Sequence, residues 1–210
     1  FKFVIIMEIE IFQIDAFTSE LFKGNPACVI PLDDWLPDEL LLNIAKENNV
    51  SETAFFVKKN NGYHLRWFTP EIEMDLCGHA TLATAYCLKY HLDYKKDKVI
   101  FDSMSGELEI KYKGEFIQMD FPHRKPVKAN LPKNIMDSLS YKPIEVLKSR
   151  DYVLVYENED KIKNIKIDKE LFDKTNLDPG GVVITSTGFN SDFVSRYFVP
   201  QCSFFEDPVT

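Results

Sequence analysis

Hydrophobic and polar positions in the first half of the chain predict short strands on either side of one apolar helix. From Ala80 to about His91, in the run ATLATAYCLKYH, apolar residues cover most of the helical circumference, which is typical of a helix enclosed by a sheet. A second helix is predicted from Asp34 to about Asn49, because proline and acidic residues occupy its first turn. Apolar or alternating runs predict strands over residues 8–15, 27–30, 51–57, 63–68, 98–101, 107–112 and 116–121. Strands on both sides of one apolar helix indicate a sheet curled around it.

The second half of the chain begins after a stretch that we interpret as a linker. Pro122–Pro132 contains proline and lysine and has no hydrophobic periodicity, which divides the chain into domains at 1–125 and 126–210. Helices are predicted at 132–139 and within 165–175, and strands at 144–148, 152–156, 182–185 and 192–199. This order weakly parallels the first half, but an enclosed apolar helix is missing.

Composition and charge narrow the class of protein. Hydrophobic residues make up 45% and charged residues 28% of the chain, and the apolar runs are too short to cross a bilayer, so we expect a soluble globular protein. The net charge of -8 with scattered lysines argues against nucleic acid or an anionic membrane as partner. The cysteines are far apart and lack metal-ligand spacing, so zinc is not expected and a reduced, cytoplasmic location is the simpler interpretation; they are Cys28, Cys77, Cys87 and Cys202.

Candidate chemistry is concentrated where a polar turn opens onto the apolar helix. The sequence DLCGHATLA at 75–83 places a thiol, a glycine and an imidazole at the amino end of this helix. Unpaired first-turn amides and the helix dipole favour a carboxylate or phosphate there, and Gly78 would let such a ligand approach the backbone. Alternatively, the small residues only permit tight packing and His79 is a cap or a core residue.

A second candidate group is Glu52, which stands at the mouth of the apolar strand in SETAFFV. Desolvation at such a position would raise the pKa of a carboxyl group, as a general acid or base requires. The alternative is an ordinary charge at the edge of a strand.

Four stretches extend this interpretation: IDAFTSELFKGNPACVI, NVSETAFF, FTPEIEMDLCGHATLATA, and DFVSRYFVPQ followed by FFEDPVT. They resemble the PhzF-like proteins of the phenazine biosynthesis isomerase group, which have a diaminopimelate-epimerase-like fold. The resemblance implies an α+β protein with two similar domains, each a curved, mostly antiparallel, barrel-like sheet around a central helix. It also implies an active site in the cleft between the domains, no cofactor, and a homodimer.

The resemblance also predicts how the chain ends and begins. In the family the EDPVT turn continues into Gly-Ser-Ala-His and a second central helix, so we expect the second domain to be incomplete and to lack its central helix. Residues 1–6, which precede Met7, are expected to be a leader or a misplaced start.

Site residues follow from the resemblance position by position. Glu52 matches the family's proton-shuttling acid, His79 the imidazole of the GHAT turn, and Asp207 the acid of the EDPVT turn. The three are expected to face one cleft. A carboxylate that removes a proton from one carbon and returns it elsewhere, beside donors for the developing charge, accounts for such a set.

The substrate is expected to be a small molecule that bears a carboxylate. Amides at Gly78, His79 and Ala80 would receive that carboxylate, with Cys77 lining the site. A cyclic hydroxy-amino acid and a linear amino acid both remain open as substrates.

Two other functions are considered. Related racemases and epimerases use a cysteine at the start of each central helix, and Cys77 fits the first position; the second falls in the EDPVT turn, which contains no thiol, so this mechanism is disfavoured. A non-catalytic small-molecule-binding or interaction protein is the other alternative.

Overall fold

The computed structural model describes residues 8–20, 22–177, 180–201 and 205–207. The chain divides into two compact units, residues 1–122 and residues 123–210. Unit 1 contains helices α1 (Asp38–Asn48) and α2 (Gly78–Tyr90), and strands β1 (Phe12–Ala16), β2 (Asn25–Leu32), β3 (Glu52–Lys59), β4 (Gly62–Phe68), β5 (Glu73–Met74), β6 (Lys98–Ser103), β7 (Gly106–Lys113) and β8 (Phe116–Asp120).

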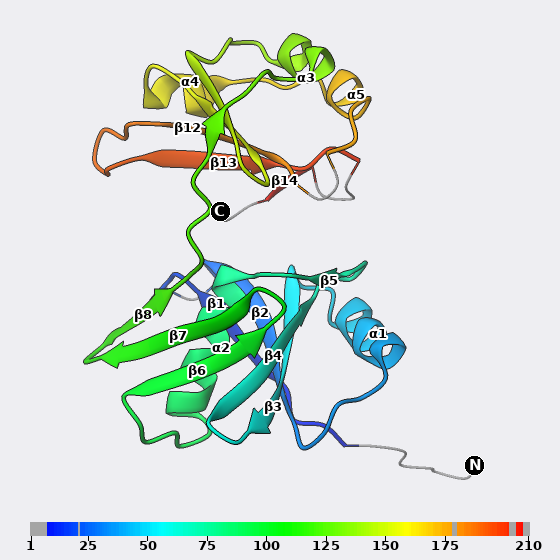
Figure 1. The fold of residues 1–210 in the computed structure, drawn as a ribbon, viewed down its shortest axis with the longest axis vertical. Helices are drawn as coiled ribbons and strands as arrows, with labels where there is room; N and C mark the ends of the chain where they lie inside the picture. The colour runs from blue at the N-terminus through cyan, green and yellow to red at the C-terminus, as the bar shows by residue number, and fades with distance from the viewer. Residues whose placement is uncertain (1–7, 21, 178–179, 202–204, 208–210) are drawn as a thin grey trace. The chain divides into compact units, whose positions relative to one another are not determined.

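The strands of unit 1 form one mixed sheet in the order β1-β2-β3-β4-β6-β7-β8, and β5 is attached to β4. The pairs β2–β3 and β4–β6 are parallel, and the other pairs are antiparallel. The sheet curls around α2, which contacts β1, β2, β3 and β8 (Figure 1). This arrangement is the one predicted from strands on both sides of an apolar helix.

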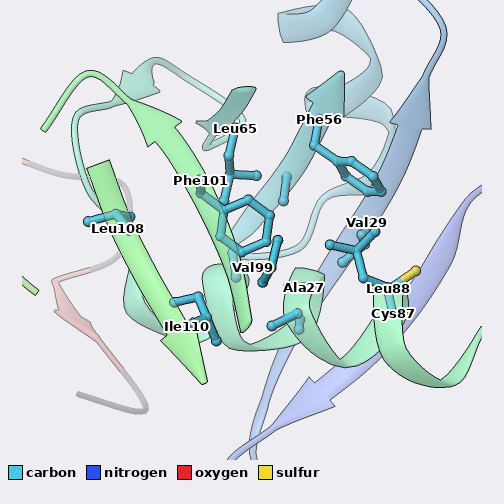
Figure 2. Close-up of a cluster of buried hydrophobic side chains, with 14 of the residues drawn as sticks. Ala27, Val29, Phe56, Leu65, Cys87, Leu88, Val99, Phe101, Leu108 and Ile110 are labelled. Carbon is cyan, nitrogen blue, oxygen red and sulfur yellow. The ribbon is translucent and has the colours of Figure 1, made fainter. Parts of the chain in front are cut away.

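The main core of unit 1 lies between α2 and the concave face of this sheet. Small residues of α2 such as Ala80 and Ala83 let the strands approach the helix closely, and larger side chains of the strands fill the remaining space. Figure 2 shows this cluster, with Ala27, Val29, Phe56, Leu65, Cys87, Leu88, Val99, Phe101, Leu108 and Ile110 labelled. Helix α1 covers the opposite face, where Leu41 and Ala45 pack on Phe55 and Phe68.

Two sequence predictions for unit 1 differ from the structure. The first strand begins at Phe12 instead of Glu8, and Phe12 and Ile14 pack against the main core. Helix α2 is not enclosed on all sides, because Tyr86 and Tyr90 are 41% and 53% exposed. Aromatic rings count as apolar in a sequence pattern, so the pattern did not distinguish this exposed stripe from the buried one.

Unit 2 contains a second sheet with three short helices. Its elements are β9 (Val127–Lys128), α3 (Lys133–Ser138), β10 (Glu145–Lys148), β11 (Tyr152–Val155), α4 (Glu159–Asn164), α5 (Lys169–Phe172), β12 (Val182–Ser186), β13 (Val194–Phe198) and β14 (Glu206–Asp207). The strand order is β14-β13-β12-β11-β10-β9, with only β11–β12 parallel. The helices and strands share a core that includes Ile135, Leu154, Phe172, Ile184 and Phe198.

The sequence pattern missed the short elements β9, α4 and β14 of unit 2. Strand β9 lies inside the stretch predicted as a linker and pairs with β10. Helix α4 has Asn158 as its N-cap, whose side chain accepts a hydrogen bond from the Lys161 amide. Because Ile162 is the only buried apolar residue of α4, no hydrophobic period marks it. None of the helices among the described residues has the length and apolar character needed to cross a membrane.

Candidate active site

The amino end of α2 presents backbone amides without helical partners. Cys77 is the N-cap residue in an extended conformation, and no side chain in the described part of the chain caps the helix. The first helical bond, from the Thr81 amide to the Cys77 carbonyl, is 3.3 Å long. The amides of Gly78, His79 and Ala80 precede it and therefore have no carbonyl acceptor within the helix. This geometry supports the predicted anion site, and occupancy by a substrate carboxylate stays a prediction.

Gly78 is not required by packing or by backbone conformation. A methyl group added at this residue would lie 3.7 Å from Cε2 of Phe121, an ordinary contact. Ligand approach at this glycine, as predicted from the sequence, therefore stays a prediction. Ala80, in contrast, is fully buried in the core, so its part in a site is limited to its amide.

Glu52 is the first residue of β3 and is held there by polar contacts of its neighbours. It pairs with Ala27 in the parallel strand β2. The Ser51 hydroxyl donates a 3.2 Å hydrogen bond to Oδ1 of the buried Asn25, and the Asn48 amide group donates to Thr53. The strand predicted at 27–30 begins after Asn25, so the sequence pattern did not single out this residue. The signal that could have found its role is a polar side chain at the start of an otherwise apolar strand.

Glu52, Cys77 and His79 lie together in unit 1. Oε2 of Glu52 is 3.3 Å from Nε2 of His79, and the two side chains are 15% and 9% exposed. On the other side of the imidazole, Nδ1 of His79 is 3.4 Å from Sγ of Cys77. The structure therefore brings together three of the predicted site residues beside the open amides of α2.

His79 is neutral at pH 7. Burial lowers the pKa of His79 from 6.5 to about 4, and a backbone hydrogen bond with Pro26 acts weakly in the opposite direction. The contact with Glu52 is consequently between a carboxyl group and a neutral imidazole, and not a permanent ion pair. A neutral imidazole can donate one hydrogen bond and accept another.

The same three side chains are a possible metal-ligand set. Their oxygen, sulfur and nitrogen donor atoms all lie within 4.8 Å of one another, and such donors suit zinc. The positive end of the α2 dipole is adjacent, however, and it disfavours a cation while favouring a carboxylate. The local electrostatics of α2 therefore favour an organic anion.

Asp207 belongs to unit 2 and is half-buried on β14, where it pairs with Tyr197 of β13. Its predicted place in one cleft with Glu52 and His79 stays a prediction. Cys202 and residues 208–210, which include part of the EDPVT turn, lie outside the described residues.

Comparisons with known proteins cover nearly the whole chain. A family model described as phenazine biosynthesis-like protein matches residues 14–210. The chain is 46% identical over 204 residues to an uncharacterized isomerase of Pseudomonas aeruginosa, covering 97% of this chain and 78% of the relative. The crystal structure of a PhzF family phenazine biosynthesis protein from Enterococcus faecalis has a TM-score of 0.86 at 43% identity, over 97% of this chain and 78% of that one. A predicted epimerase of Pseudomonas aeruginosa, at 18% identity and a TM-score of 0.65 over 95% of this chain and 76% of that one, shares the fold.

Proposed function

Because the chain belongs to the phenazine biosynthesis-like protein family, we propose that it is an isomerase that moves a proton on a small carboxylate-bearing substrate by acid–base catalysis, without a cofactor. Membership confirms the resemblance identified from the sequence, and the structural neighbours confirm the α+β, epimerase-like fold. The observation that carries the proposal is the 3.3 Å contact of Glu52 with His79 beside the amide end of α2.

Each group in unit 1 has a distinct chemical task in this proposal. The Glu52 carboxylate removes a proton from a substrate carbon and returns it at another position, which isomerises the substrate without net gain or loss of atoms. The neutral imidazole of His79 donates a hydrogen bond to the negative charge that develops on the substrate. The amides of Gly78 and His79 bind the substrate carboxylate and orient it.

Asp207 is proposed as the second acid, on the basis of its match to the family's EDPVT turn. The half-buried position of Asp207 on β14 is consistent with this role. A homodimer is also part of the proposal, and light scattering of the purified protein tests it.

Proton exchange with solvent tests the function. The protein is incubated in D₂O with a panel of cyclic hydroxy-amino acids, including trans-4-hydroxy-L-proline, and linear L-amino acids. Proton NMR then follows loss of the signal at the exchanging carbon. We expect at least one compound to incorporate deuterium, and Glu52→Gln to slow this exchange by about 100-fold or more. Glu107→Gln, which removes an exposed carboxylate, is the control and should exchange normally.

A thiol-based mechanism is the second candidate, because Sγ of Cys77 lies 3.4 Å from an imidazole nitrogen at a helix amino end, a setting that activates thiols. Cys77→Ser distinguishes the two. Retained exchange in Cys77→Ser together with loss in Glu52→Gln supports the carboxylate; the reverse result supports the thiol. Cys87→Ala is the matched control, because burial, with a smaller effect of Glu10, raises the pKa of the Cys87 thiol to about 12. Binding of a panel compound without exchange would instead support a non-catalytic binding protein.

A further inference from the structure

The two units share a short sequence pattern that precedes a candidate site residue, Cys77 in unit 1 and Asp207 in unit 2. RWFTP at 66–70 and RYFVP at 196–200 each lie at the end of a strand, β4 in unit 1 and β13 in unit 2. Each is followed by a two-residue strand whose first residue is glutamate: β5, Glu73–Met74, and β14, Glu206–Asp207.

The arginine of each pattern donates two hydrogen bonds to the carboxylate of this glutamate. In unit 1, Nε and Nη2 of Arg66 each donate to a carboxylate oxygen of Glu73 at 2.7 Å. In unit 2, Nε and Nη2 of Arg196 donate to Oε1 and Oε2 of Glu206 at 2.6 and 2.8 Å. Such bidentate pairs fix both distance and orientation.

The aromatic residue two positions after each arginine lies under the guanidinium group. Cζ of Arg66 is 5.0 Å from the centre of the Phe68 ring, and Cζ of Arg196 is 4.9 Å from that of Phe198. Nη1 of Arg196 also donates to the Ile162 carbonyl at the end of α4. Three groups therefore hold the guanidinium of Arg196 in one orientation.

Strand register is also the same in both units. Phe68 pairs with Glu73 as Phe198 pairs with Glu206. The next pair along is Trp67–Met74 in unit 1 and Tyr197–Asp207 in unit 2.

It follows that Asp207 occupies in unit 2 the position that Met74 occupies in unit 1. The local fold forms with methionine at this position, so it does not require a carboxylate there. The acid is a departure from the repeated structure, which points to a chemical role for Asp207.

Among the residues that the structure describes, two pairs join β14 to β13, and the Val199 amide donates a 3.1 Å hydrogen bond to the Phe205 carbonyl just before β14. A slip of this short pairing by one residue would exchange the faces to which Glu206 and Asp207 point. Neighbouring side chains of a strand point to opposite faces. The pair with Arg196 keeps Glu206 on the face of the sheet that also carries Phe198. Asp207, the next residue, is thereby kept on the opposite face.

We propose that Arg196, through its bidentate pair with Glu206, is a positioning residue that fixes the register of β14 and so aims Asp207 for proton transfer. The catalytic part of this inference rests on the proposed function, whereas the register part does not. Arg66 and Glu73 are the equivalent pair in unit 1, where β5 leads toward the Cys77–His79 turn.

Arg196→Lys is the main test, because lysine keeps the positive charge but cannot form the bidentate hydrogen bonds with Glu206. We expect kcat for the exchanging substrate of the NMR panel to fall about 10- to 100-fold, with KM unchanged within about threefold. Amide hydrogen exchange of the peptide that contains Glu206 and Asp207 should accelerate. Asp137→Asn is the control, since it removes an exposed charge pair with Lys133 in the same unit, and it should change neither quantity.

Asp207→Met tests the equivalence of Asp207 and Met74 directly. This variant should fold, keep the wild-type hydrogen-exchange rate at β14, and lose turnover by about 100-fold or more. Unchanged kcat and unchanged exchange in Arg196→Lys, or unfolding of Asp207→Met, would overturn the proposal. If no panel compound is turned over, the proposed function fails, and the hydrogen-exchange rate at β14 still decides whether Arg196 fixes the register.

Discussion

Protonation of His79 should make unit 1 sensitive to acid in a pH range where most proteins change little. Folding buries the imidazole and lowers the pKa of His79 from 6.5 to about 4, so the unfolded chain binds a proton more readily than the folded one between these values. Stability attributable to His79 should therefore be undiminished above pH 6.5, decrease as the pH falls, and reach its minimum below about pH 4.

The magnitude follows from the difference between the two pKa values. At about 1.4 kcal/mol for each pKa unit, the change from 6.5 to about 4 corresponds to roughly 3 kcal/mol. About 2 kcal/mol of this should be lost between pH 7 and pH 5. His79→Gln removes the titrating group. Between pH 7 and pH 5 the free energy of unfolding of this variant should therefore decrease by about 2 kcal/mol less than that of the wild type.

Tryptophan fluorescence during urea unfolding is a suitable assay, because both tryptophans, Trp35 and Trp67, lie in unit 1 with His79. Wild type and His79→Gln are compared at several pH values from about 4.5 to 8, a range that covers most of the interval between the two pKa values of His79. Burial also lowers the pKa of His64, and comparing the two proteins cancels that contribution. His123→Gln, at an exposed position, is the control and should show the wild-type pH dependence.

The reasoning would be refuted if the stability difference between wild type and His79→Gln stayed constant across this range. An NMR titration gives an independent check, since the ring protons of His79 should shift near pH 4. A transition near pH 6.5 would mean that the imidazole is not buried in solution, and the neutral hydrogen-bond donor in the proposed mechanism would lose its basis.

The remaining predictions concern glycines and the core. Gly78→Ala should leave thermal stability nearly unchanged, because the added methyl makes only an ordinary contact, but raise KM for the exchanging substrate about tenfold by obstructing the α2 amides; an unchanged KM would argue against ligand approach at this residue. Gly62→Ala is its counterpart and should destabilise unit 1, since the methyl would lie 2.2 Å from the Ile100 carbonyl oxygen. Phe101→Ala, in the fully buried core, should cost about 3–5 kcal/mol in urea unfolding, whereas Phe116→Ala, at an 80% exposed ring, should cost less than about 0.5 kcal/mol.

Local patterns in the sequence were sufficient to predict most of the secondary structure. The apolar helix at α2, the acidic start of α1 and the strands with alternating or apolar runs are properties of contiguous residues. Elements with few apolar residues were missed: β5, β9 and β14 are two residues long, and α4 buries one apolar side chain. Such elements form because a neighbouring strand or a capping residue stabilises them. They are too short, or contain too few apolar residues, to show a hydrophobic period in the sequence.

What the sequence by itself determined was the type of chemistry: a glutamate at the start of a strand, and a thiol, glycine and imidazole at the start of an apolar helix. Only the tertiary structure decided that these groups meet, because residues 52 and 79 are separated along the chain and come within 3.3 Å through the pairing of β2 with β3 and the packing of α2 inside the sheet. It also decided that His79 is neutral, since the pKa of an imidazole depends on the burial that folding imposes. The matching registers of β5 and β14 likewise depend on hydrogen bonds between strands, which no stretch of sequence specifies alone.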